Sequence, residues 1–344
     1  MKRIKFNKLL NFSEKLFLKA NLDIETAQSV SYGLCETSLR GVDSHGIRLI
    51  PHYIESALKG RKNPKPKYKF HSTFPAFGYL DADNTFGHAA GIKAIDLAMP
   101  IAKKYGISAI TVKNSSHPGA MATFTLRAAR KGFIAFAFTH ADALVCSYGG
   151  TRAYFGTNPI CFSAPRSNSD PFCLDMAPTS ISWNKLLSHK EDGKKLEKKY
   201  AVDVNGSSTD DPIKAKTLLP IGDYKGFGLA AMGEVLCGIL SGMNFGRSIP
   251  SMFNSDISKP RKLGQFFLVM RTDVCQDSNS FENNLYRMSE ELRSEPNKKN
   301  NNVLVPNDPQ IIESKIREEK GIPLDMNLNH KLNEISKKFG LDEI

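Results

Sequence analysis

The alternation of short strands with helices after residue 76 constrains the fold of this chain more than any other feature. Runs rich in β-branched and aromatic residues, such as ISAITVK and IAFAFTH, alternate with helical stretches such as GHAAGIKAIDLAMPIAKKY. Strands that alternate with helices over roughly 200 residues are typical of layered α/β domains. We therefore predict an α/β domain over residues 71–299.

The two ends of the chain have helical patterns instead. Asp23 is placed to cap one helix, and a second helix is predicted to begin near Ser44. The proline-broken, charged segment RKNPKPKYK is the best candidate for a linker, and SEPNKKNNN is a polar low-complexity loop near the other end. We expect the C-terminal helices to pack on the N-terminal ones, which predicts a discontinuous helical domain from residues 1–70 and 300–344.

The positive charge of the chain is the main departure from an average globular composition. The formal net charge is +12, with basic clusters at Arg61–Lys69, Lys194–Lys199 and Lys259–Lys262. No helix-turn-helix, RNA-recognition or zinc-finger pattern accompanies these clusters, so we interpret them as solvated surface and predict no nucleic-acid partner. A positive field would favour an anionic dinucleotide and a carboxylate substrate.

Neither a membrane segment nor an export signal is predicted. The N-terminus has no continuous apolar core and no small-residue cleavage site. The most apolar stretch, Gly226 to Gly242, contains Glu234 and is shorter than the roughly 20 residues of a membrane span, so we expect a buried core helix there. Six scattered cysteines without a C-x-x-C pair indicate buried thiols in a reducing compartment, no metal site and a cytoplasmic location.

The segment GVDSHGIRLIPHY combines a histidine with an arginine. Ser44 could cap the helix, with His45 in its first turn and Arg48 one turn later on the same side. Histidine suits the transfer of a hydroxyl proton because its unperturbed pKa is about 6.5, and the planar guanidinium of arginine suits a carboxylate. The spacing is equally compatible with a solvated polar helix start.

Two strand ends supply further polar candidates. Asn114 and His117 lie where a strand gives way to a helix, a place where ligand-binding residues gather in α/β folds. His140 and Asp142 follow the next strand; the carboxylate of Asp142 could orient a histidine or hold a substrate hydroxyl, but an Asx turn is as compatible with the pattern. The alternative for His117 is a turn histidine bonded to backbone.

The segment GDYKGFGLAAMG matches a dinucleotide fingerprint only formally. No clear strand precedes Gly226, and no acidic residue follows about 20 positions later, so the glycines are better explained by close helix packing. Lys225 is a separate matter, because a lysine at a helix start attracts phosphate. The chain contains no strand–GxGxxG–helix unit, which disfavours a standard Rossmann domain.

Taken in order, these segments resemble the malate/L-lactate dehydrogenase family, which includes ureidoglycolate, sulfolactate and 2,3-diketogulonate dehydrogenases or reductases. The matching stretches are GVDSHGIRLIPHYIESALKGR, DADNTFGH, VKNSSHPGAMA, YGGTRAYFGTNPICFSAP, LDMAPTSISWNKL, GSSTDDP, GDYKGFGLAAMGEVLCGILSG, VPNDPQ and EKGIPLD. The resemblance spans roughly residues 20–325. It implies a cytoplasmic, usually dimeric enzyme with a non-Rossmann NAD(P)-binding domain, which transfers a hydride between NAD or NADP and a small 2-hydroxy or 2-oxo acid.

The resemblance also implies roles for individual residues. His45 matches the catalytic acid/base, His117 a second active-site histidine, and Arg48 the carboxylate anchor. We expect His45 to transfer the proton, with His117 and Asn114 orienting the substrate and Asp142 assisting catalysis. The predicted cofactor-binding residues are His140, Asp175, Met176, Ala177, Lys225, Gly226 and Pro306.

Three departures from the family pattern qualify this assignment. Pro118 follows His117 where the family commonly has Phe, His140 stands where it commonly has Asn, and Asn307–Asp308 replaces the usual Gly-Glu after Pro306. The substrate can therefore differ from those of well-known relatives. A catalytically silent member that binds an anionic ligand or partner is the alternative, and a metal-dependent hydrolase is a third interpretation that lacks a compact ligand motif.

Overall fold

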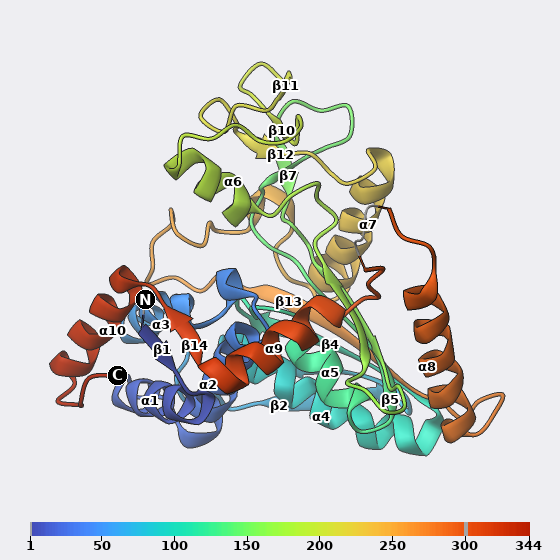
Figure 1. Ribbon diagram of the computed structural model, residues 1–344. Helices are drawn as coiled ribbons and strands as arrows, with labels where there is room; N and C mark the ends of the chain where they lie inside the picture. The colour runs from blue at the N-terminus through green and yellow to red at the C-terminus, as the bar shows by residue number, and fades with distance from the viewer. Residues whose placement is uncertain (1, 299–301) are drawn as a thin grey trace.

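The centre of the molecule is a seven-stranded mixed sheet. A computed structural model describes residues 2–298 and 302–344, and the sheet has the strand order β2-β3-β4-β13-β5-β8-β9 (Figure 1). Its strands are β2 (Lys69–Phe74), β3 (Phe77–Asp81), β4 (Ile107–Ser115), β5 (Phe133–Thr139), β8 (Ile160–Ala164), β9 (Phe172–Met176) and β13 (Leu263–Arg271). β3 and β4 pair in parallel, whereas the other neighbouring pairs are antiparallel. The predicted α/β class is confirmed, and the sheet is unlike the parallel sheet of a Rossmann domain.

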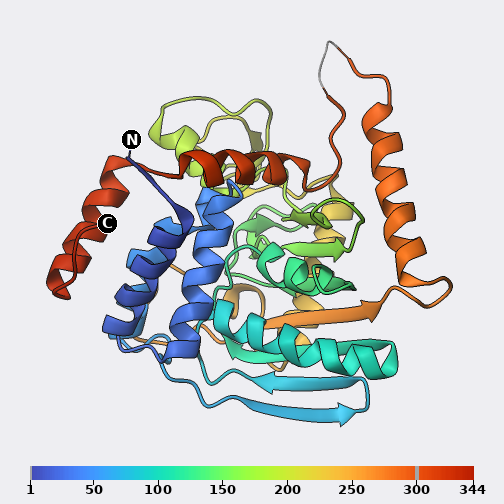
Figure 2. The same ribbon diagram turned by 60° about the horizontal axis from the view of Figure 1, so that its bottom comes forward.

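Helices cover both faces of this sheet. α4 (Gly87–Tyr105) and α5 (Ala122–Ala129) pack on one face (Figure 2). Phe124 of α5 packs there with Phe267, in a buried core that also includes Val269. The neighbouring β13 residue Phe266 points to the opposite face and packs with Cys237. That face is covered by α7 (Tyr224–Glu234) and the π-helical turn η3 (Val235–Ile239). Successive side chains of a strand point to opposite faces, so β13 contributes to both cores.

The two ends of the chain form one helical unit with a shared core. β1 (Lys2–Ile4) pairs antiparallel with β14 (Ile322–Leu324), and Leu332 and Ile344 lie in the same core as Leu16 and Leu34 (Figure 1). The helices of this unit are α1 (Phe6–Lys19), α2 (Ile24–Leu39), α3 (Ile50–Leu58), α9 (Asp308–Lys320) and α10 (Met326–Lys338). The carboxylate of Asp23 accepts a hydrogen bond from the Thr26 amide at 2.8 Å, so the predicted cap of α2 is confirmed.

The domain boundaries themselves stay predictions. The predicted boundary at residues 299 and 300, and part of the predicted loop SEPNKKNNN, lie outside the described residues. α8 (Ser278–Ser294) precedes this stretch at the edge of the molecule (Figure 2).

A small second sheet, which the sequence did not predict, lies above the central sheet in Figure 1. Its strand order is β11-β10-β12-β6-β7. Its elements are β6 (Val145–Cys146), β7 (Ala153–Phe155), β10 (Ala201–Val202), β11 (Ser208–Thr209), β12 (Thr217–Leu218) and the adjacent helix α6 (Trp183–Glu191). It has its own core, which includes Val145, Leu186 and Leu218. Strands of two or three residues are too short to show a period-2 pattern, so the sequence does not separate this unit from the large domain.

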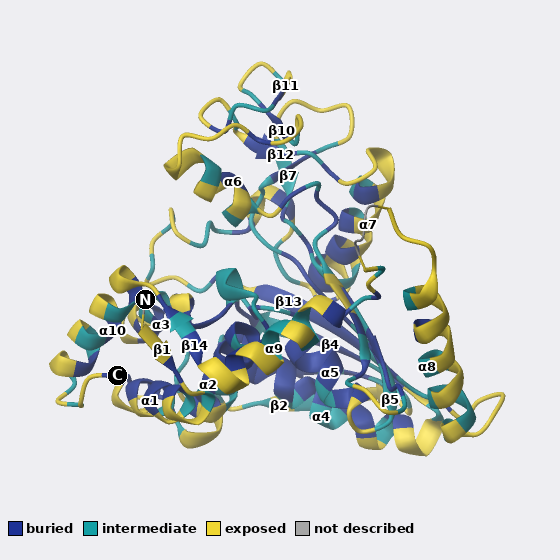
Figure 3. Cartoon of the chain, viewed as in Figure 1, coloured by how far each residue is buried: buried dark blue, intermediate teal, exposed yellow. Residues whose placement is uncertain are grey.

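The helix predicted at Gly226–Gly242 forms, but it is not a buried core helix. Figure 3 shows exposed and buried residues alternating along α7. Cys237 and Gly233 face the sheet, whereas Val235 is 50% and Ile239 58% exposed. Gly226 packs closely, because a Cβ there would lie 2.3 Å from the Ile221 carbonyl oxygen. The same explanation is wrong for Gly228, where a Cβ would meet no atom within 4 Å.

Candidate active site

Two histidines from distant parts of the chain stack on each other between the helical unit and the end of β4. His45 lies in the 3₁₀ turn η1 (Asp43–His45), and His117 follows β4. Their ring centroids are 5.7 Å apart with planes inclined by 23°. Both residues keep part of their surface exposed, so a ligand could reach them. The structure therefore brings together the two histidines that the sequence singled out.

His45 and Arg48 are presented differently from the prediction. They lie in two successive 3₁₀ turns, η1 and η2 (Ile47–Leu49), and the α-helix α3 begins only at Ile50. The Ser44 hydroxyl lies 2.8 Å from His45 Nδ1 instead of capping a helix. Arg48 is exposed and makes no hydrogen bond or ion pair with the residues that the structure describes. Its guanidinium is thus available to an anion from solvent.

Tyr53 orients the ring of His117. Its buried hydroxyl lies 2.8 Å from His117 Nδ1 and donates to the His117 carbonyl oxygen at 3.0 Å. Both contacts form at once when the single hydroxyl proton goes to the carbonyl oxygen and Nδ1–H donates to the tyrosine oxygen. In that tautomer the lone pair of Nε2 is free to accept a proton. Nothing in the local sequence around Tyr53 indicates this role.

A buried arginine, Arg261, approaches the same region. Its Nε donates to the Pro250 carbonyl oxygen at 2.8 Å, and its Nη2 forms an ion pair with Asp142. Its Nη1 is buried and has no partner among the described residues. The carboxylate of Asp142 therefore contacts Arg261 and, at 3.4 Å, the Met252 amide, rather than a histidine or an Asx turn. Asp142 therefore orients this arginine, and its predicted part in catalysis stays a prediction.

Two members of the predicted solvated clusters, Arg61 and Lys62, are buried as well. They are 1% and 2% exposed, and Arg261 of the third cluster is also 2% exposed, so the solvated-surface interpretation is wrong for these positions. Arg61 donates to the carbonyl oxygens of Met252 and Asp256, both at 2.7 Å, and so holds the loop that precedes Arg261. A cluster of charged residues in a sequence does not reveal such burial, because it has no helical or strand periodicity that would mark a buried face.

Burial, aided at His117 and His88 by nearby positive charges, favours the neutral form of the histidines. Burial, followed by the charges of His45, Arg261 and Lys62, lowers the pKa of His117 well below its ordinary value. Burial also lowers the pKa of His45, and burial with Lys62 lowers that of His88 to about 3. Desolvation and nearby like charges both disfavour the protonated ring. The arrangement therefore suits a neutral histidine that accepts a proton beside an anionic ligand.

The predicted cofactor segments meet around β9. The carboxylate of Asp175 accepts a hydrogen bond from the Ala122 amide at 2.8 Å, at the start of α5. Desolvation of this carboxylate raises its pKa to about 6. Beyond the strand, the Ile221 amide donates to the Pro178 carbonyl oxygen at 3.1 Å, which places Lys225 and Gly226 near Met176 and Ala177. Lys225 is exposed.

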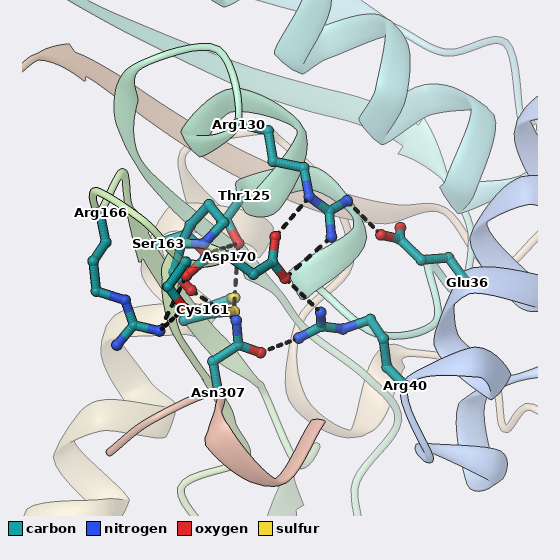
Figure 4. Close-up of polar contacts among 12 residues, drawn as sticks. Glu36, Arg40, Thr125, Arg130, Cys161, Ser163, Arg166, Asp170 and Asn307 are labelled. Atoms are coloured by element: carbon teal, nitrogen blue, oxygen red, sulfur yellow. Dashed lines mark hydrogen bonds and ion pairs between the residues drawn. The ribbon is translucent and has the colours of Figure 1, made fainter. Parts of the chain in front are cut away.

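The third cofactor segment, around Pro306, is fixed by a network of arginines (Figure 4). The Asn307 side chain donates to the Pro171 carbonyl oxygen at 2.7 Å and accepts from Arg40. Arg40 also contacts Asp170 at 3.4 Å, and Arg130 contacts the same carboxylate at 3.1 Å. Asn307 has a φ of +87°, a region that asparagine tolerates better than most residues and glycine best. The departure from the family's glycine is thus accommodated by asparagine.

Two predicted site residues have structural partners instead. The ring of His140 has no exposed surface; its Nε2 accepts from the Gly264 amide at 2.8 Å, and Nδ1 faces Glu234 at 3.6 Å. Cofactor binding by His140 stays a prediction. The Asn114 amide donates to Asp81 at 2.9 Å, in a left-handed turn at the end of β4. Substrate binding by Asn114 stays a prediction.

Neither a metal cluster nor a membrane-spanning helix occurs among residues 2–298 and 302–344. No three His, Cys, Asp or Glu side chains of these residues gather in a way that could hold a metal ion. No helix in the same residues is long and apolar enough to cross a membrane.

Comparison with known proteins identifies the family of this chain. The family model described as malate/L-lactate dehydrogenase matches residues 4–333. The chain belongs to the malate/L-lactate dehydrogenase family. It is 33% identical over 312 residues to ureidoglycolate dehydrogenase (NAD(+)) of Escherichia coli strain K12, covering 90% of this chain and 89% of the relative. It is 30% identical over 236 residues to (2R)-3-sulfolactate dehydrogenase (NADP(+)) of Chromohalobacter salexigens, covering 68% and 71%.

The fold of this chain also matches a solved structure over almost its whole length. The crystal structure of malate dehydrogenase from Entamoeba histolytica superposes with a TM-score of 0.93 at 26% identity, covering 99% of each chain. The sequence-based family assignment is therefore confirmed. Members of the family are NAD(P)-dependent dehydrogenases of 2-hydroxy acids, and this chain is an oxidoreductase of that kind.

Proposed function

We propose that the protein transfers a hydride reversibly between NAD or NADP and a small 2-hydroxy or 2-oxo acid, with His117 moving the hydroxyl proton. The single observation that supports this best is the contact of Tyr53 with both Nδ1 and the carbonyl oxygen of His117. It holds the ring in place, and in the tautomer that uses both contacts Nε2 can accept a proton. Ser44 gives His45 no such constraint, because a serine hydroxyl can donate to or accept from Nδ1.

The residues around β9 fit a dinucleotide. Lys225 is an exposed cation at the start of α7, where helix amides and a positive side chain together favour phosphate. Asp175, Met176, Ala177 and Pro306 would line the rest of the site. A bound NAD or NADP would supply or accept the hydride. Both forms stay open, since one relative is named for each.

The substrate carboxylate has two candidate anchors. Arg48, the anchor expected from the sequence, is exposed and follows His45 by one short turn. Arg261 is buried, is held by Asp142, and keeps Nη1 unpartnered among the described residues. We propose that both cations bind the substrate: Arg48 as it enters, and Arg261 in the closed site, where a desolvated guanidinium binds a carboxylate more strongly.

We further propose that the protein is a homodimer and that the exposed apolar side of α7 and η3 forms part of the interface. Leu229, Met232, Val235 and Ile239 lie at helical spacing and are between 38% and 58% exposed. Contiguous apolar surface of this kind marks interaction sites. Light scattering of the purified chain at several concentrations tests the dimer. The predicted cytoplasmic location agrees with six free thiols, five of them buried.

The activity can be tested with a panel of 2-oxo acids offered with NADH and with NADPH, followed by the absorbance of the reduced cofactor. In the oxidative direction His117→Ala should lower kcat on the order of 10²- to 10⁴-fold and remove the histidine limb of the pH profile. His45→Ala should keep that limb. The opposite outcome would return the proton to His45, as expected from the sequence. Cofactor binding without any turnover would favour the silent-member alternative.

A further inference from the structure

The ammonium of Lys62 has an unusual environment for a lysine. It is buried with no hydrogen-bond partner among the described residues, and it lies 3.3 Å from the centroid of the Tyr53 ring. The Phe86 ring lies on another side at 4.7 Å. Burial, followed by the charges of Arg261 and Arg61, lowers the pKa of Lys62 well below its ordinary value. The two aromatic faces act in the opposite direction, because they stabilise the charged ammonium where water is excluded.

Lys62 touches the face of the same ring whose hydroxyl holds His117. The tyrosine hydroxyl contacts His117 Nδ1 at 2.8 Å, and the two rings meet edge to face with centroids 6.3 Å apart. The Tyr53 side chain therefore contacts both the ammonium and the imidazole. The low dielectric of this buried region weakens a charge interaction less than solvent would.

Other charged and titratable groups also face His117 and have to be counted. They are His45 of η1, Tyr53 of α3, His88 of α4 and Arg261 before β13. Arg261 is neutralised in part by its ion pair with Asp142. His45 and His88 are themselves held neutral by burial. Lys62 is thus the cation near His117 that has no carboxylate partner within the described residues.

We propose that Lys62 is a positioning residue that acts through the Tyr53 ring to keep His117 neutral and ready to accept the hydroxyl proton. This inference rests on the proposed role of His117. A like charge so close disfavours protonation of the imidazole, while the ring contact also holds the tyrosine hydroxyl in place. Lys62 does not contact the substrate, because its ammonium has no accessible surface.

The test is Lys62→Met, which keeps an unbranched apolar chain between the two rings and removes the charge. The pKa of His117, followed by NMR of the ¹³C-labelled ring and assigned with His117→Ala, should rise by about one unit. The acid limb of kcat/KM for oxidation of the 2-hydroxy acid should move to higher pH by the same amount. Lys62→Arg, which restores a cation, should return the limb toward the wild-type position.

Lys59→Met is the matched control, because Lys59 lies at the C-cap of α3, three residues before Lys62, but is exposed and paired with Glu55 at 2.7 Å. It should move neither the ring titration nor the limb. An unchanged His117 titration in Lys62→Met would overturn the proposal, as would an equal shift in the control. Should Lys62→Met not fold, Lys62→Gln serves the same comparison. A limb that survives in His117→Ala would instead refute the proton-transfer role, while the ring titration still decides the effect of Lys62.

Discussion

Asn307 offers a way to separate a backbone requirement from a side-chain contact at one position. The residue is 2% exposed, has a φ of +87°, and joins Arg40 to the Pro171 carbonyl oxygen just before α9. Asn307→Gly removes the two hydrogen bonds but suits the backbone. Asn307→Ala removes the same bonds and places a Cβ in the left-handed region. The difference between the variants therefore isolates the backbone term.

The magnitudes can be worked from the two contacts. A hydrogen bond to a charged group contributes about 1.5–3 kcal/mol and an amide-to-carbonyl bond about 1 kcal/mol. Arg40 keeps Asp170, so its loss falls at the lower end of that range. Asn307→Gly should cost about 2.5 kcal/mol of unfolding free energy, and Asn307→Ala about 1 kcal/mol more for the left-handed conformation. Because Pro306 belongs to the proposed cofactor site, both variants should also bind NADH more weakly.

Urea unfolding followed by circular dichroism measures the free energies, and the shift of the melting temperature on adding NADH measures cofactor binding. Asn168 is the matched control: its φ is +57°, it is exposed, and its side chain makes no hydrogen bond within the described residues. Asn168→Ala should cost only the backbone term, and Asn168→Gly almost nothing. Equal stabilities of Asn307→Ala and Asn307→Gly would refute the backbone argument. A wild-type stability for Asn307→Gly would refute the bridging role.

Two further pairs of variants test the site. Gly119→Ala should lower the free energy of unfolding by about 3 kcal/mol or more, because φ is +72° and the new Cβ would lie 2.4 Å from His88 Nε2. Gly60→Ala is the control: φ is +84° but no atom lies within 4 Å of the new Cβ, so the loss should be about 1 kcal/mol. Urea unfolding compares the two variants. Arg48→Lys and Arg261→Lys should both raise KM for the acid substrate in steady-state assays, since lysine lacks the bidentate fork, and a kcat/KM within about twofold of wild type would exclude that arginine as an anchor.

Features that depend on residue period and on helix caps could be predicted from the sequence. The cap at Asp23, the alternation of strands and helices, and the two histidines at element ends all have local signals, and each is present in the structure. The small second sheet has strands too short for such a signal. The 3₁₀ turns that hold His45 are another case, because Ser-His-Gly is as compatible with a helix start as with a tight turn.

The contacts of Tyr53 and Asp142 could not be predicted, because their partners come from segments that are distant in sequence. Tyr53 looks like an ordinary core position of a helix, and Asp142 looks like a turn residue. Their roles depend on contacts with His117, 64 residues away, and with Arg261, 119 residues away. No local pattern encodes pairings over such separations. A family resemblance gave the position of the histidines without the contacts that distinguish them.

The chain buries a charged side chain and exposes an apolar one, each the reverse of the usual preference. Lys62 lies inside, although an unpaired ammonium is among the most costly groups to bury, and Val235 lies outside, although it belongs to the most apolar stretch of the sequence. Neither position lowers the free energy of an isolated monomer, so each needs a compensating contact or role. For Lys62 the compensation inside the chain is aromatic, and its placement one ring away from His117 gives the charge a use in proton transfer. The apolar side of α7 has no such cover within the described part of the chain, which is why a second copy is the partner we propose for it.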